Sequence, residues 1–258
     1  MGNFMTKIFS ANLNKNYLTT IPSAERSLFF TFAHILNEIN AFHKLLFWSS
    51  ADSFIGNEAE NDGRRTFAFM FLGLLAGKLK EAGKFLWEEF DKSEFSKTYE
   101  ANLRSEEKEA LARIRHYFEN KNNTIWRIRD SLAFHYTPEA PKALDAAFLD
   151  VPDNLKAYIE QGGRANNLYY FAEILASRAL LKTKGDLGDQ TIYRKLVDEI
   201  LEVARWFVTA FDAITAEFIR RYQDNIWDGD AESVEFDNLQ PTKSIKIPWF
   251  TDTSDIYE

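Results

Sequence analysis

The spacing of apolar residues predicts long α-helices over most of the chain. Between residues 23 and 50 apolar side chains recur at steps of three and four, which gathers them on one face of a 3.6-residue repeat. Ser23 follows Pro22 and suits the N-cap position. A second stripe runs through residues 189–222, at Ile192, Leu196, Ile200, Val203, Phe207, Phe211, Ile214 and Phe218. We therefore expect two long amphipathic helices that pack along their whole length.

Further helices are predicted from the same periodicity and from the breaks between them. Their expected ranges are 64–91, 105–120, 124–137, 141–149 and 164–182. The helix 124–137 begins near Asn123 or Thr124 and ends before Pro138, because the residue before a proline is disfavoured in the α region. Residues 1–22 and 52–63 are polar and irregular, and no strand-like alternation is sustained. The sequence thus predicts an all-α fold, a multi-helix bundle of long antiparallel helices.

Beyond Tyr222 the periodicity stops and the chain becomes acidic. Residues 223–258 hold nine acidic residues and two lysines, a net charge of -7, and so leave -1 of the total -8 for residues 1–222. We expect residues 1–222 to form the helical bundle domain and residues 223–258 an irregular acidic tail. That tail should be extended and partly docked by its aromatic residues, Trp227, Phe236, Trp249 and Phe250. The nearly neutral body does not exclude an RNA partner.

Composition removes several classes of function. The absence of cysteine excludes disulfides, thiol catalysis and cysteine-bound metal. The most apolar run, residues 67–77, is about half the length that spans a bilayer, so no membrane segment is predicted. The start of the chain does not resemble a secretory leader, and we expect a cytoplasmic protein. Nucleotide-binding glycine loops and the nucleophile elbow of hydrolases are also missing.

Metal and cofactor binding are not expected either. His34 and Glu38 stand four residues apart on the first predicted helix, with His43 and Glu81 as potential partners from packed helices. However, the chain has no Glu-x-x-His pair, which is the signature of di-metal helical bundles. The sequence therefore predicts no metal site and no cofactor.

The segment Arg129-Asp130-Ser131-Leu132-Ala133-Phe134-His135 carries the pattern that suggests chemistry. It resembles the signature of the HEPN superfamily of helical-bundle proteins, in which an arginine is followed by Asn, Asp or His and then by a histidine after four to six residues. Residues 75–82 and 129–136 are also similar to a group of uncharacterised bacterial all-helical proteins. The HEPN resemblance implies a metal-independent endoribonuclease of a bacterial toxin or phage-defence type, with its groove formed between two protomers.

The resemblance also implies roles for three residues. Arg129 would contact and neutralise the scissile phosphate, His135 would transfer a proton, and Asp130 would orient the pair. These residue types suit cleavage through the ribose 2′-hydroxyl, which needs a group titrating near neutrality and a fixed positive charge. On a straight helix Arg129 and His135 lie about 120° apart, so the helix must distort or a second copy must close the groove. Asp130 replaces the more frequent Asn and could hold Arg129 in an internal ion pair.

Residues 104–129 form a locally basic region that could face RNA. The candidate RNA-binding residues are Arg115, Lys121, Trp126 and Arg127. The expected partners are RNA, a second copy of the chain, and an antitoxin or another protein. Two alternatives stay open. One is a non-catalytic helical scaffold or protein-interaction module. The other is that the acidic tail covers the groove as a phosphate mimic, which is compatible with either function.

Overall fold

The structure is a computed structural model that describes residues 7–49, 56–130, 140–149, 155–160, 166–182, 190–235, 245 and 247–251. Its elements are β1 Lys7–Ser10, α1 Lys15–Leu18, α2 Ser23–Ser49, α3 Glu58–Phe85, the π-helical turn η1 Leu86–Phe90, α4 Ser96–Asn102, α5 Ser105–Glu119, α6 Thr124–Asp130, α7 Ala140–Phe148, α8 Tyr170–Lys182, α9 Gln190–Arg221, α10 Gln223–Ile226 and β2 Glu232–Glu235.

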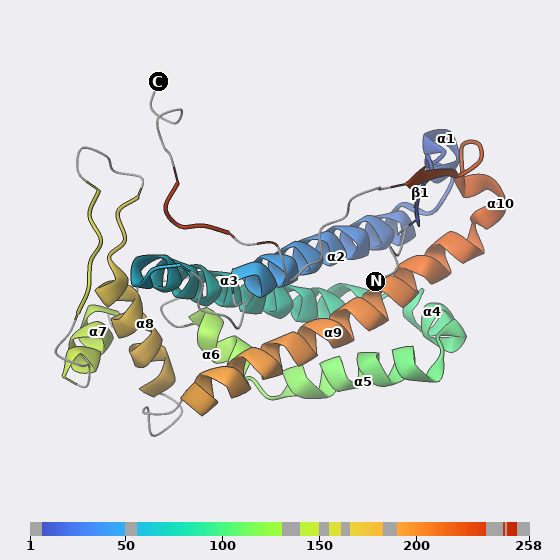
Figure 1. Cartoon of the computed structure of the whole chain (residues 1–258). Coiled ribbons are helices and arrows are strands. Elements are labelled where there is room, and N and C mark those ends of the chain that lie inside the picture. Colours follow the sequence, from blue (N-terminus) through green and yellow to red (C-terminus); the bar gives the residue numbers. More distant parts are fainter. Residues whose placement is uncertain are drawn as a thin grey trace.

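Three long helices form the body of the molecule. α2 and α3 run antiparallel, α9 packs against both, and α5 covers the outer side of α9 (Figure 1). The short α6 lies against α3 and α9, while α7 and α8 form a pair at the end of the bundle where α3 begins. The predicted all-α bundle of long antiparallel helices is confirmed. None of the helices in the described residues is long and apolar enough to cross a membrane.

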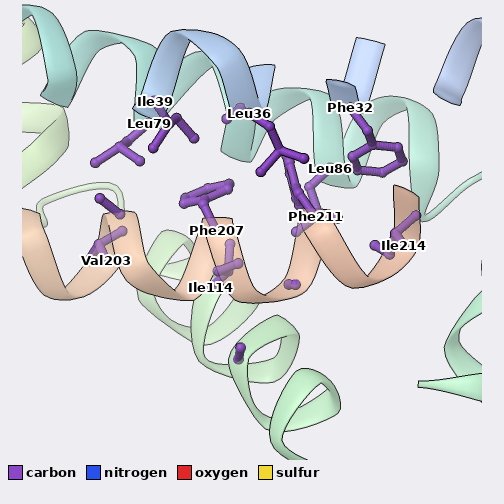
Figure 2. Packing of buried hydrophobic residues seen from close by; sticks show 14 of the residues in the cluster. Phe32, Leu36, Ile39, Leu79, Leu86, Ile114, Val203, Phe207, Phe211 and Ile214 are labelled. Atoms are coloured by element: carbon purple, nitrogen blue, oxygen red, sulfur yellow. The ribbon is translucent and has the colours of Figure 1, made fainter. Parts of the chain in front are cut away.

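The core lies between α2, α3 and α9, where the predicted apolar stripes face one another. Figure 2 shows side chains from these helices meeting in one cluster, with Ile114 joining from α5. Phe207 and Phe211 of α9 are fully buried, and each packs edge-on against other rings. Each such side chain stabilises the fold by about 1.5–3 kcal/mol. The predicted helices 23–50 and 189–222 are thus confirmed as α2 and α9.

α3 begins six residues earlier than predicted and ends in a different geometry. The Asn57 side-chain oxygen accepts a hydrogen bond from the Glu60 N–H at 3.0 Å, which caps the first turn. The acidic residues of that turn favour the positive end of a helix, although they resemble a loop in the sequence. At the other end the Asp91 N–H donates to the Leu86 carbonyl at 2.8 Å, a five-residue step. The short α4 that follows was not predicted.

The remaining helices agree with the sequence in position but not in every boundary. α5 and α7 match the predictions 105–120 and 141–149. α6 begins where expected, but residues 131–139 of the predicted helix 124–137 and its approach to Pro138 lie outside the described part of the chain. α8 begins at Tyr170 instead of residue 164, because Tyr158 and Leu168 exchange two backbone hydrogen bonds of 2.8 Å in an antiparallel bridge.

Residues 7–10 and 232–235 form a small sheet, which corrects the expectations that residues 1–22 are irregular and that residues beyond 222 form an extended tail. β1 and β2 pair antiparallel, with Ile8 opposite Val234. The Asn14 N–H also donates to the Ile226 carbonyl at 2.8 Å, and the Ile226 side chain is fully buried. Residues 223–235 are therefore built onto the N-terminal segment. Such pairing joins positions far apart in sequence, which local patterns do not reveal.

Part of the predicted tail docks through its aromatic rings. The ring of Trp249 lies 4.8 Å from that of Phe67 on α3, centroid to centroid. Phe250 packs edge-on against Tyr158 at 6.0 Å. Phe236, the other predicted ring of this stretch, lies outside the described residues.

Candidate functional site

The helix α6 carries the first part of the candidate motif. Ile125 and Ile128 are each at most 2% exposed, and α6 packs against α3. Arg129 and Asp130 are the last two described residues of this helix and directly follow Ile128. Their side chains, and the whole of His135, lie outside the described part of the structure. The structure therefore gives the backbone position of the motif's beginning.

The first turn of α6 is fixed by a carboxylate from α9. The Thr124 hydroxyl donates to one oxygen of Glu199, and the Tyr117 hydroxyl donates to the other, each at 2.7 Å. Burial and then the hydrogen bond to Glu199 raise the pKa of Tyr117 well above its usual value. Both carboxylate oxygens are thus engaged, and they join α5, α6 and α9. The sequence predicted none of these contacts, because they connect residues about 80 positions apart.

Asn123 caps the same turn. Its side-chain oxygen accepts from the Trp126 N–H at 2.9 Å, and its amide nitrogen donates to the Tyr117 carbonyl at 3.0 Å. Asn is a preferred residue at helix starts because it satisfies a backbone N–H that the helix leaves unpaired. The break Asn120-Lys121-Asn122-Asn123 in the sequence did place this boundary.

Lys80 places a buried positive charge beside α6. Only 8% of Lys80 is exposed, and its Nζ lies 3.5 Å from the centroid of the Trp126 ring. A cation over an indole face is attracted by the ring's quadrupole, most strongly where water is excluded. Trp126 precedes Arg129 by one turn of α6, so this charge lies close to the start of the motif. A sequence signal existed, since Lys80 follows the buried Leu72 and Ala76 at steps of eight and four.

The four candidate RNA-binding residues differ in exposure and in their contacts. Lys121 is exposed, whereas Trp126 and Arg127 are partly buried. Arg115 is held by two carboxylates: its guanidinium donates to Asp91 and to Glu100, with the shortest contact to each 2.5 Å. Its hydrogen bonds to Glu100, and then those to Asp91, raise the pKa of Arg115 further above its usual value. Its side chain therefore links α5 to α4 and to the end of η1.

Other arginines of the basic region 104–129 are also paired. Arg104 forms an ion pair with Glu107 at 2.5 Å, within the first turn of α5. Arg113 forms one with Glu109 at 2.5 Å. These exposed pairs contribute little to stability, but each carboxylate offsets a charge that would otherwise attract phosphate. Arg104, Arg113 and Arg115 of this basic stretch are thus each paired with a carboxylate.

The contacts found for the other histidines are with residues outside α6. His34 is exposed and lies 3.7 Å from Glu38, which is itself paired with Lys78 of α3. His116 is exposed and lies 3.3 Å from Glu119. Burial and then the charge of Arg205 lower the pKa of His43. Within the described residues, no three His, Asp or Glu side chains are grouped as metal ligands would be.

A buried carboxylate at the opposite end of the bundle was not predicted. Glu25 of α2 is 2% exposed and accepts hydrogen bonds from the hydroxyls of Tyr99 and Tyr222, at 2.6 and 2.7 Å. Arg221 lies 3.6 Å from the same carboxylate. A small cavity beside it is lined mainly by apolar side chains, Leu28, Phe29, Phe32, Phe90, Ile214 and Phe218. The cluster has a structural role, because it joins α2, α4 and the end of α9.

Comparison of this chain with protein-family models, with curated proteins and with solved structures finds no match.

Proposed function

We propose that the chain is an RNA-directed helical protein of HEPN type, a metal-independent endoribonuclease whose motif is Arg129, Asp130 and His135. The observation that carries the proposal is the position of Arg129 and Asp130. They stand on a helix that is capped by Asn123, joined to α9 through Glu199 and packed on α3. A motif at such an anchored position, inside an all-helical bundle, agrees with what the sequence resemblance implies.

The reaction would proceed through the ribose 2′-hydroxyl. The His135 imidazole takes the hydroxyl proton, and the 2′-oxygen attacks the adjacent phosphorus. The bond from phosphorus to the 5′-oxygen breaks, and that oxygen receives a proton, which leaves a 2′,3′-cyclic phosphate and a 5′-hydroxyl. Arg129 offsets the charge that develops on the phosphate. The Lys80 ammonium lies over the ring of Trp126, which precedes Arg129 by about one turn of α6.

Within this proposal a second copy closes the groove, because the two motif residues lie about 120° apart on a regular helix. The partners we propose are therefore RNA, another copy of the chain, and an antitoxin or another protein that restrains the activity. A cytoplasmic location would agree with such a role.

The test is RNA cleavage by the full chain in the presence of EDTA. His135→Ala and Arg129→Ala should each lower the cleavage rate by about 10²-fold or more, because general acid–base and charge-stabilising groups contribute factors of this size. His116→Ala is the matched control, since His116 is exposed on α5. A 2′-deoxy nucleotide at the cleaved position should stop the reaction. The proposal is contradicted if the His135→Ala variant still cleaves RNA, or if the unaltered chain does not cleave RNA in the presence of EDTA.

A second candidate is a non-catalytic helical scaffold that binds proteins. Its support is the pairing of Arg104, Arg113 and Arg115 with carboxylates, which leaves less free positive charge for phosphate contacts. The two candidates differ in the salt dependence of RNA affinity. An RNA-binding surface loses affinity steeply as salt rises, because counterions are released on binding. Loss of a cellular phenotype in His135→Ala, with fold and protein binding unchanged, would disfavour the scaffold.

A further inference from the structure

The two-stranded sheet of β1 and β2, here called the ribbon, exposes apolar side chains on both of its faces. Ile8 and Val234 stand opposite each other and so share one face, where they are 46% and 40% exposed. Phe9 lies on the other face and is 69% exposed. An antiparallel sheet commonly packs an apolar face on the core and turns a polar face to water. The ribbon departs from this pattern, because each face carries an exposed apolar residue.

The backbone of the ribbon offers a place for a further strand. Within the described residues the sheet consists of β1 and β2, so each strand pairs along one edge. The other edge of each strand presents a row of N–H and C=O groups that have no partner in the sheet. A ribbon of two strands is only marginally stable, and a third strand adds stability. Exposed apolar faces and such an edge are together what an added strand requires.

Carboxylates surround β2 and define the charge of a partner. Asp228, Asp230 and Glu232 are all exposed, and none of them forms an ion pair with another described residue. They belong to the segment 223–258, whose net charge is -7. This negative potential attracts lysine and arginine, and it repels the phosphates of RNA and the same acidic segment of another copy. The charge therefore favours a basic protein segment over RNA and over a second copy of the chain.

We propose that β2 is the docking strand for an extended basic segment of another protein, which adds to the ribbon as a third strand. The backbone of that segment pairs with the edge of β2 that faces away from β1. Its apolar side chains extend the face of Ile8 and Val234, and its basic side chains lie near Asp230 and Glu232. The ribbon lies beside α1, away from α6 (Figure 1), so the interaction is independent of the proposed ribonuclease activity.

The test uses the full-length chain and a fluorescein-labelled peptide of seven alternating lysine and valine residues. The peptide should bind saturably and one to one, with a Kd of about 100 μM or lower and with an affinity that falls as salt rises. The same peptide with glutamate in place of lysine should not bind, because its charge repels β2. A peptide N-methylated at every residue should not bind either, because it lacks backbone donors. Absent binding of the basic peptide, or equal binding of either control peptide, overturns the proposal.

Full-length variants locate the bound peptide on the ribbon. Ile8→Ser with Val234→Ser removes the apolar face and should weaken binding about fivefold or more. Asp230→Lys with Glu232→Lys alters exposed side chains alone, and should weaken binding of the basic peptide and permit binding of the glutamate peptide. Met70→Ser, on α3 and as exposed as Ile8, is the matched control and should bind as the unaltered chain does.

Two results would overturn the assignment to β2. One is binding of the basic peptide that neither double variant changes. The other is self-association of the unaltered chain in light scattering that Ile8→Ser with Val234→Ser abolishes, because a second copy would then occupy the ribbon. RNA cleavage plays no part in these measurements, so their outcomes are distinct from those of the ribonuclease proposal.

Discussion

Glu25 and Glu199 are two carboxylates that each receive two tyrosine or threonine hydroxyls and thereby join helices distant in sequence. Burial and then the hydrogen bond to Glu25 raise the pKa of Tyr222 to about 12 and that of Tyr99 further. A tyrosine in the unfolded chain has a pKa near 10. These hydroxyls must therefore stay protonated in the folded chain at a pH where they ionise in the unfolded chain.

The consequence is an alkaline loss of stability. The free energy of unfolding should be independent of these groups below pH 10 and should fall above it, by at most about 1.4 kcal/mol per pH unit for each tyrosine, until the folded pKa is passed. Urea unfolding between pH 9 and 11.5 measures this slope. Tyr99→Phe with Tyr222→Phe should reduce it, whereas Tyr169→Phe, at an exposed position, should leave it unchanged. Equal slopes in all variants would contradict the assignment.

At the scale of elements, α6 is held by contacts from other parts of the chain. Asn123 caps its first turn, Ile125 and Ile128 are buried, and Glu199 of α9 accepts a hydrogen bond from Thr124. The sequence predicted that a helix starts here, because the asparagine-rich break is local information. It did not predict the contact of Lys80 with the Trp126 ring or the hydrogen bond from Thr124 to Glu199, because those partners come from other helices.

Removing the cap should loosen α6 selectively. Asn123→Ala deletes the acceptor for the Trp126 N–H and should destabilise the helix start by about 1 kcal/mol. Hydrogen exchange of residues 124–130 should become about fivefold faster, with α2 and α9 unchanged. Asn122→Ala is the matched control, because Asn122 is exposed in the same break. Equal exchange in both variants would show that the cap does not hold α6.

At the scale of the whole molecule, residue 222 marks a clear change in charge between body and tail, but it is a weaker boundary in the structure. The tail holds most of the negative charge, as the sequence shows, yet its first part pairs with the N-terminal segment through β2 and α10. Ile226 is fully buried, and the Asp228 N–H donates to the Asn12 carbonyl at 2.8 Å. The segments 7–14 and 226–235 thus stabilise one another.

Ending the chain after Tyr222 should therefore lower the stability of the helical body. The loss of buried Ile226 alone removes about 1.5–3 kcal/mol, and the backbone bonds to Asn12 and Asn14 contribute further. Thermal unfolding should show a clear fall in Tm relative to a chain that ends after Thr251. Identical Tm values for the two truncations would mean that residues 223–251 contribute nothing to the fold.

The sequence by itself determined the helical class, the buried faces of α2 and α9, and the motif beginning at Arg129, because helix periodicity and motif spacing are local properties of the chain. Tertiary structure alone decided which partners meet. The pairing of β1 with β2, the carboxylates on Arg115 and the approach of Trp249 to Gly63 each join residues far apart in sequence. Which distant groups meet depends on how the helices pack, and the spacing along a single element does not encode that arrangement.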